Sequence, residues 1–309
     1  MPISLPPIDR RRFLHGTLSG VATSLFPSLL WADASTSSQD VWAILSDTHI
    51  PGNRNRNGGK PSINPVEHFR KIRADILSSE AGKPVGLIHC GDCAYMQGMP
   101  EDYTTFLEEF EPIRQVGLPV HFLMGNHDNR EAFLRAVARM EKRESPQTIP
   151  NRLHSILETP KANFFLLDSL ENTNSTPGLL GQAQLEWLAD ELDARKDKPA
   201  LLFAHHYPRF FRTRPARLTE FKDTDELLQC IVPRKQVKAF VFGHSHLWNT
   251  YHLEELLWIN IPTTAWRDDP TQPFAWVLLT LKENGVSLKL RSIDPEHPKH
   301  NETVELTWR

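Results

Sequence analysis

Val120-His121-Phe122-Leu123-Met124 is a short apolar run that stops at Gly125 and is followed by Asn126, His127 and Asp128. Such a run predicts a buried strand, and the glycine predicts a turn at its end. Burying an amide, an imidazole and a carboxylate is unfavourable unless each group finds a partner, so the stretch predicts a hydrogen-bond network or a metal site. Taken alone, a glycine turn with a hydrogen-bonded asparagine is the commoner explanation.

Four other apolar runs in the chain end in the same way. They lack polar alternation, which is typical of strands in a sheet that is covered on both faces. Ligands of such sheets bind beyond the carboxyl ends of the strands, so the polar residues should gather at one rim. The runs and their ends are 41–45 with Ser46-Asp47-Thr48-His49, 85–88 with His89-Cys90-Gly91-Asp92, 200–204 with His205-His206, and 239–242 with Gly243-His244-Ser245-His246.

The residues brought to this rim form one set of nitrogen and oxygen donors. Residues two apart in extended backbone point the same way, so Asp47 should face with His49, and His244 with His246. A set without thiolates suits Mn, Fe, Co or Zn better than a structural zinc site. Its size exceeds the needs of one ion with an open position and suits two ions that share a carboxylate. The candidate metal ligands are Asp47, His49, Asp92, Asn126, His205, His244 and His246.

In this order, the motifs resemble the five signature motifs of the calcineurin-like metallophosphoesterase superfamily. The pattern is closest to small bacterial cyclic-nucleotide and glycerophosphodiester phosphodiesterases. The resemblance implies an α/β fold, a four-layer αββα sandwich of two mixed β-sheets flanked by helices. The motifs are Asp47-x-His49, Gly91-Asp92, Gly125-Asn126-His127-Asp128, His205-His206 and Gly243-His244-x-His246, and they span residues 47–246.

The resemblance also implies a role for each motif residue. Two cations would lower the pKa of a shared water enough to form the hydroxide that attacks phosphorus at neutral pH. His127 would protonate or hydrogen-bond the leaving group, and Asp128 would orient His127. One metal would be held by Asp47, His49, Asp92 and His246, and the other by Asp92, Asn126, His205 and His244, with Asp92 bridging.

Two features depart from the pattern of the family. Tyr207-Pro208 stands where relatives commonly carry two prolines, so the substrate contacts of that loop are expected to differ. Tyr95 completes a Gly-Asp-x-x-Tyr form seen in purple acid phosphatases, whose tyrosine binds ferric iron. Those enzymes usually lack a histidine where His49 stands, so we expect Tyr95 to pack near the site rather than to bind metal.

Cationic residues close to the strand ends are candidate substrate contacts, because guanidinium groups bind phosphate oxygens well. The loop after His49 is rich in Gly and Asn and carries Arg54 and Arg56; a solvated surface position is the competing explanation for each. The loop after His206 is both aromatic and cationic, and is alternatively a packed arm or an oligomer contact. The candidate substrate-binding residues are Arg54, Arg56, His206, Arg209 and Arg212.

We therefore expect a metal-dependent phosphoester hydrolase that acts on a small-molecule substrate, with a diester favoured. A phosphomonoesterase or a pyrophosphate-bond hydrolase is the alternative, since all three substrates use the same two-ion attack. A non-catalytic scaffold of the same fold is a further alternative, but no ligand of the motifs is missing. The natural substrate, the native metal pair and the oligomeric state are left open.

Composition agrees with a single enzyme domain. The 309 residues, 39% of them hydrophobic, are enough for one sizeable core. A net charge of −3 without a basic stripe does not favour binding to nucleic acid. No apolar run approaches the length that spans a bilayer, so stable membrane insertion is not expected.

The first 34 residues predict an export signal. Arg10-Arg11-Arg12-Phe13-Leu14 resembles the twin-arginine motif, an apolar segment covers residues 17–31, and Ala32-Asp33-Ala34 has a small-x-small cleavage pattern. We expect residues 1–34 to be a twin-arginine signal peptide and residues 35–309 to be the metallophosphoesterase domain. The protein would then be periplasmic or secreted, with the twin-arginine export machinery as a partner. A disordered basic arm is the competing interpretation.

Three cysteines imply no complete disulfide framework. Cys90 and Cys93 could pair in an oxidising compartment, but free buried thiols are favoured, and Cys230 is expected to pack in the core.

Asp168 matches no motif and is interpreted as a structural carboxylate. Hydrophobic periodicity predicts helices at 65–79, from 102, at 131–143 and at 182–195, a hairpin over 152–168, and strands at 249–253, 256–261, 274–282 and 286–293.

Overall fold

The structure is a computed structural model of the chain. It describes residues 4–5, 40–58, 62–78, 82–141, 149–209, 220–253 and 255–308. The predicted export signal lies outside the described residues except for Ser4–Leu5, and so do Arg212 and most of the loop after His206. Among the helices that are described, none is both long enough and apolar enough to cross a membrane.

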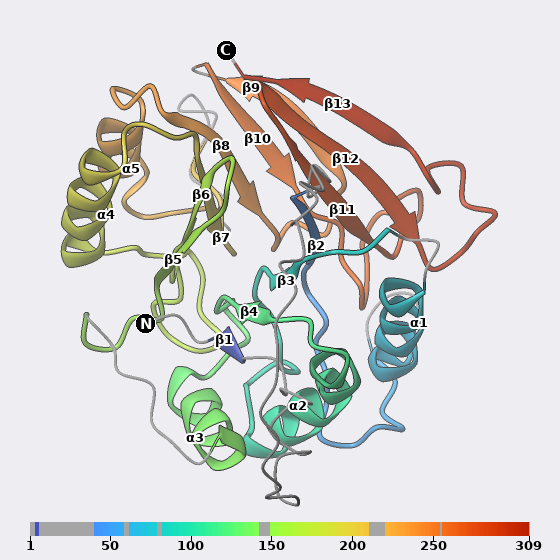
Figure 1. Cartoon of the computed structure of the whole chain (residues 1–309). Helices are drawn as coiled ribbons and strands as arrows, with labels where there is room; N and C mark the ends of the chain where they lie inside the picture. Colours follow the sequence, from blue (N-terminus) through green and yellow to red (C-terminus); the bar gives the residue numbers. More distant parts are fainter. Residues whose placement is uncertain are drawn as a thin grey trace, which may run out of the picture.

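Two mixed β-sheets face each other (Figure 1). Both have parallel strands at the centre and antiparallel strands toward the edges. In spatial order, the first sheet contains β1 (Ser4–Leu5), β4 (Val120–Phe122), β3 (Gly86–His89), β2 (Val41–Leu45), β11 (Ala275–Lys282), β12 (Gly285–Ser292) and β13 (Thr303–Thr307). The second contains β5 (Ser155–Glu158), β6 (Asn163–Leu166), β7 (Ala200–Ala204), β8 (Val237–Phe242), β10 (Leu256–Asn260) and β9 (Asn249–Leu253).

Helices cover the outer faces of the two sheets (Figure 1). The buried side chains fall into three clusters: between the first sheet and its helices, between the two sheets, and between the second sheet and its helices. These clusters separate four layers, so the predicted αββα sandwich is confirmed. The helices on the first sheet are α1 (Pro65–Leu77), α2 (Pro100–Gln115) and α3 (Arg130–Glu141), and those on the second are α4 (Gln182–Ala194) and α5 (Thr224–Ile231).

The helix ends follow local sequence signals. Asn64 caps α1 by accepting a hydrogen bond from the Glu67 backbone N–H at 3.1 Å, and Pro65 occupies the first helical position. The predicted start of α2 at Asp102 is wrong, because the helix begins at Pro100. Asp102 still serves the helix end, since its carboxylate accepts the Met99 backbone N–H at 3.0 Å.

The predictions for residues beside the motifs are confirmed. Cys90 and Cys93 are free and buried, and they lie in different clusters: Cys90 between the sheets, and Cys93 between the first sheet and its helices. Cys230 packs against the cluster between the second sheet and its helices. Asp168 is a buried structural carboxylate that pairs with Arg130 at 2.7 Å.

Candidate metal centre

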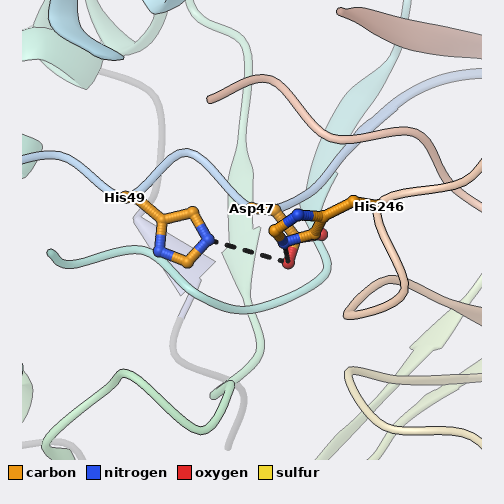
Figure 2. A group of neighbouring side chains, drawn as sticks. All are labelled: Asp47, His49 and His246. Carbon is orange, nitrogen blue, oxygen red and sulfur yellow. Dashed lines mark ion pairs between the residues drawn. The ribbon is translucent and has the colours of Figure 1, made fainter. Parts of the chain in front are cut away.

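The parallel strands β2, β3, β4, β7 and β8 place the motif residues at one rim, between the two sheets. Figure 2 shows the His49 and His246 rings directed at the carboxylate of Asp47, with Nε2–Oδ1 distances of 4.0 Å and 3.3 Å. Asp92 Oδ2 lies 3.6 Å from Nε2 of His49 and 3.3 Å from Nε2 of His205. Asp92 therefore stands between two groups of donors.

The second group is built around His205. Its Nε2 lies 3.3 Å from the Asn126 side-chain oxygen as well as 3.3 Å from Asp92. Donor atoms of Asp92, His205 and His244 lie within 4.8 Å of one another. The structure thus brings together all seven of the predicted ligands. We call Asp47, His49 and His246 the His49 half, and Asn126, His205 and His244 the His205 half, with Asp92 shared.

The backbone at the ligands differs from the prediction. Residues two apart were expected to face together because the backbone is extended, but five of the ligands have positive φ. This left-handed conformation is uncommon outside glycine and is typical of strained functional sites. Asp47 and His49 form one alternating pair of left-handed residues, and His244 and His246 form another. In each pair this conformation turns both side chains toward the site. The five are Asp47 (φ 56°), His49 (φ 44°), Asp92 (φ 55°), His244 (φ 64°) and His246 (φ 58°).

Main-chain hydrogen bonds hold this strained backbone in place. The Asp47 N–H donates to the Gly91 carbonyl, and the His49 N–H donates to the Asp92 carbonyl, each at 3.0 Å. From the segment after β10, the Thr264 hydroxyl donates to the Asp47 carbonyl at 3.1 Å. The two aspartate loops and the segment after β10 therefore form one connected unit.

Glycines allow the close approach of the loops. A Cβ added at Gly125 would lie 2.1 Å from Asp92 Oδ1 and 2.4 Å from the Asp92 backbone nitrogen. A Cβ added at Gly243 would lie 2.0 Å from Ser46 Oγ and 2.8 Å from Asp47 Oδ2. Both glycines are needed for their small size, because any side chain would collide with a motif residue.

Burial and mutual charge set the protonation of the site. Burial lowers the pKa of His49 and that of His244 to about 3, so both rings are neutral. Burial alone would lower the pKa of His205, but the charge and hydrogen bond of Asp92 raise it to about 9. Burial would also raise the pKa of Asp92, yet the nearby histidines hold it well below its usual range. The carboxylates are thus ionised and attract positive charge.

These residues fit metal ions. Nε2 of His49 and Nε2 of His244 are buried and have no hydrogen-bond partner among the described residues. Buried polar atoms without partners are rare, and a cation in each half would satisfy them. His205 Nδ1 lies 2.8 Å from the Cys90 carbonyl, so it donates its proton there, and Nε2, 3.3 Å from Asp92 Oδ2, is the ring atom that would bind a metal after releasing its own proton. Imidazole and carboxylate donors of this kind suit transition metals.

His127 lies at the rim but does not receive the support that was predicted. Its backbone N–H donates to Asp92 Oδ1 at 2.9 Å, and its Nδ1 lies 2.6 Å from the Met96 carbonyl. It also shares a group of possible donors with His49 and Asp92. The predicted orienting partner is wrong: in the described part of the chain it is the Met96 carbonyl that holds the His127 ring.

Asp128 instead joins loops of the site. It is fully buried and accepts hydrogen bonds from the backbone N–H groups of Gly125, Cys93 and Ala94 at 2.9 to 3.1 Å. The Tyr103 hydroxyl donates to the same carboxylate at 3.2 Å. Burial, followed by the charge of Asp92, raises the pKa of Asp128 to about 6. Its contacts make it a structural brace between the loops that carry Asp92 and Asn126.

The predicted substrate arginines are placed differently from one another. Arg54 is bound to Glu108 and, at 3.2 Å, to Glu109, both on α2. Arg56 is exposed, and its guanidinium lies 4.2 Å from the centre of the Tyr95 ring, without a carboxylate partner among the described residues. Arg209 lies 3.9 Å from Asp225. Of these three, Arg56 is the cation that remains available to a substrate.

His206 and Tyr95 lie beside the centre. His206 is fully buried, its Nδ1 is 2.8 Å from the Ser169 hydroxyl, and its ring centre is 4.7 Å from that of His244. Tyr95 packs as predicted, with its ring 5.8 Å from that of Trp266. His206 is therefore a buried neighbour of a ligand, without the exposure that a substrate contact requires.

Sequence analysis missed Trp266. Its indole stacks on the His49 ring at a centroid distance of 3.9 Å and an angle of 22°, and meets the His246 ring edge-on at a centroid distance of 6.2 Å. Trp266 follows β10 and belongs to no motif, so no spacing rule could connect it to the site. The signal in the sequence was only indirect: a tryptophan in a largely polar stretch, Thr263-Thr264-Ala265-Trp266-Arg267.

Two solved structures with a similar fold are phosphatases by name. A dimetal phosphatase from Danio rerio superposes with a TM-score of 0.66 at 14% identity, covering 87% of this chain and 99% of that one. A purple acid phosphatase from yellow lupin seeds superposes with a TM-score of 0.58 at 14% identity, covering 88% of this chain and 54% of that one. At these identities the likeness shows the fold.

Several sequence relatives are phosphodiesterases by name. A probable glycerophosphodiester phosphodiesterase of Arcobacter nitrofigilis is 29% identical over 66% of this chain and 73% of that protein. A probable cyclic nucleotide phosphodiesterase of Rhodococcus erythropolis is 27% identical over 65% of this chain, but the match spans only 63% of that protein. A 3',5'-cyclic adenosine monophosphate phosphodiesterase of Pseudomonas aeruginosa is 24% identical over 65% of this chain and 68% of that protein.

The family itself is established by a match to a family model over about two thirds of the chain. Residues 42–247 fit the family model described as calcineurin-like phosphoesterase, a range that contains every ligand of both halves. The motif resemblance is therefore confirmed, and the chain belongs to the calcineurin-like phosphoesterase family.

Proposed function

We propose that this chain is a phosphodiesterase that depends on two metal ions. The observation that carries the proposal is the place of Asp92, whose Oδ2 lies 3.6 Å from His49 Nε2 and 3.3 Å from His205 Nε2. One carboxylate oxygen between two sets of donors is the arrangement that two-metal hydrolases use. The phosphodiesterases among the relatives support the same reaction class.

The ions belong to the two halves of the centre. The His49 half with Asp92 would hold one ion, and the His205 half with Asp92 would hold the other, both drawn from Mn, Fe, Zn or Co. When bound, such ions neutralise the charge of the phosphoester and activate the attacking water. The residues of the chain bind and orient the ions, and they keep the carboxylates ionised.

His127 is placed to act on the leaving group. Its Nδ1 proton is donated to the Met96 carbonyl, so a proton at Nε2 is present only when the ring is an imidazolium. As an imidazolium, His127 would donate that proton to the departing alkoxide, and in the neutral form Nε2 would accept a hydrogen bond. Asp92 holds the backbone N–H of His127 and so fixes the distance of the ring from the centre.

The supply of free cations favours a diester. A monoester carries an additional negative charge and needs more cationic contacts than a diester. Arg54 is neutralised by Glu108 and Glu109, whereas Arg56 remains unpaired among the described residues. Among the described candidate arginines, Arg56 alone lacks a carboxylate partner, and one such cation suits the single charge of a phosphodiester.

The proposal is tested by hydrolysis after reconstitution of the metal-free protein with Mn, Fe, Zn or Co. We expect bis(p-nitrophenyl) phosphate to be hydrolysed faster than p-nitrophenyl phosphate. The Asp92→Asn variant should lose about a hundred- to a thousandfold in kcat/KM, because groups that stabilise transition-state charge contribute about 10² to 10³ each. Faster monoester hydrolysis would favour the phosphomonoesterase alternative. Wild-type rates in Asp92→Asn, or an inactive reconstituted wild type, would favour a non-catalytic scaffold.

We also propose export by the twin-arginine route, on the strength of the sequence of residues 1–34. Replacing Arg10 and Arg11 together with lysine should keep the protein in the cytoplasm and leave its in vitro activity unchanged. Cell fractionation followed by immunoblotting measures this. A cytoplasmic wild-type protein of full length would contradict the proposal.

A further inference from the structure

Histidines that bind metal usually donate their second ring N–H to a carbonyl or a carboxylate, which fixes the orientation of the ring. His205 follows this rule, because its Nδ1 lies 2.8 Å from the Cys90 carbonyl. His49 does not: its Nδ1 is fully buried and has no hydrogen-bond partner among the described residues. Something other than a hydrogen bond must therefore hold the His49 ring.

The Trp266 indole fills that role geometrically. It lies face to face with the His49 ring, with centroids 3.9 Å apart and planes at 22°. The other rings near His49, those of His127 and His246, meet it edge-on at 5.3 Å and 5.7 Å. Rotation of the His49 ring out of this plane would drive its edge into the indole, so the stack fixes the plane of the ring.

Trp266 is itself fixed to the strand end that carries His49. The Thr264 backbone N–H donates to the Ser46 carbonyl at 3.3 Å, and the Thr264 hydroxyl donates to the Asp47 carbonyl at 3.1 Å. The Ala265 N–H donates to the Thr263 hydroxyl at 3.2 Å. These hydrogen bonds therefore fix the segment before Trp266 to the strand end that carries Asp47 and His49.

We propose that Trp266 is a positioning residue that holds the imidazole of His49 in its metal-binding orientation by ring stacking, in place of the missing hydrogen bond. The inference rests on the proposed two-metal function but concerns one half of the centre. It predicts that loss of the indole weakens the ion of the His49 half and spares the ion of the His205 half.

The test measures metal binding rather than activity. Metal-free wild type, Trp266→Ala and Trp266→Phe are titrated with Mn²⁺ by calorimetry, and the bound metal is counted by elemental analysis. Trp187→Ala is the matched control, because Trp187 is also half-buried and also contacts a histidine, His154, at 4.4 Å, but outside the metal centre. Circular dichroism of the metal-free proteins checks that each variant folds.

We expect Trp266→Ala to weaken one of the two ions about 10- to 100-fold, the range for loss of a residue that supports a ligand, and to leave the other unchanged. Trp266→Phe should restore most of the affinity, since it keeps a ring to stack, and Trp187→Ala should match the wild type. Wild-type affinity for both ions in Trp266→Ala would overturn the inference, as would equal losses in the alanine and phenylalanine variants. A wild type that binds no metal would instead overturn the proposed function.

Discussion

The two halves of the metal centre use the same kinds of ligand but support them by different forces. In the His205 half, the ring of His205 is held by a hydrogen bond to the Cys90 carbonyl, two residues before the shared Asp92. In the His49 half, the ring of His49 is held by a stacked tryptophan from the segment after β10. The ligands of both halves are visible as motifs, but the support comes from a residue beside a motif in one half, Cys90, and from a segment outside every motif in the other.

The largest effects are expected from two glycine substitutions that separate the halves. In Gly125→Ala, the added Cβ would meet Asp92 at 2.1 Å and 2.4 Å, so both ions should be lost. In Gly243→Ala, the Cβ would meet Ser46 and Asp47, which belong to the His49 side, so one ion should remain. Elemental analysis after dialysis distinguishes the two outcomes. Equal metal content in the two variants would show that the halves are not separable in this way.

A smaller effect is expected from the arginines near the His49 half. The Arg56 guanidinium lies over the Tyr95 ring, and the Tyr95 ring in turn contacts Trp266 beside this half. Arg54 is instead bound to carboxylates of α2. Arg56→Gln should raise KM for the diester about tenfold, the equivalent of one charge-assisted hydrogen bond of about 1.5 kcal/mol, with little change in kcat. Arg54→Gln, the matched control, should leave KM unchanged. If the two variants have the same KM, Arg56 does not contact the substrate.

His121 provides the baseline for a buried imidazole outside the centre. Like His49, it is buried and has an Nδ1 without a partner among the described residues. Burial lowers its pKa from 6.5 to about 4. The unfolded chain therefore takes up a proton before the folded chain does, and the contribution to stability that is present above pH 6.5 is lost as the pH falls toward 4.

The His121→Leu variant should not show this loss of stability at low pH. Between pH 7 and pH 5, the free energy of unfolding of the wild type should fall by about 2 kcal/mol more than that of the variant. Urea denaturation of the metal-free proteins at both pH values measures the difference. Parallel pH dependence of the two proteins would mean that His121 is protonated in the folded state.

The layers and the ligands could be predicted from the sequence, because they depend on local patterns. Unbroken apolar runs identified β2, β3, β7 and β8, and the residues directly after each run proved to lie at one rim. The side-chain direction of Asp47 and His49 was predicted for the wrong reason, since both residues are left-handed rather than extended. A short motif fixes which residue types meet, but not the backbone conformation that brings them together.

The supporting contacts could not be predicted, because they join segments far apart in the chain. Asp128 was expected to orient its neighbour His127 but binds the backbone of Cys93 and Ala94. Arg54 was expected to face a substrate but is bound to carboxylates of α2, a helix whose packing no motif describes. Trp266 carried only the indirect signal of a tryptophan in a polar stretch, which says nothing of its partner. In each case tertiary packing decides which partner a polar or aromatic side chain finds.

The most direct test of the two-ion centre is the number of Mn²⁺ ions bound by the metal-free protein, measured by calorimetric titration and elemental analysis. The wild type should bind two ions, Asp47→Asn and His205→Gln about one each, and Asp92→Asn none with comparable affinity, because only Asp92 is shared. A wild type that binds a single ion, or an Asp92→Asn variant that still binds two, would contradict the account.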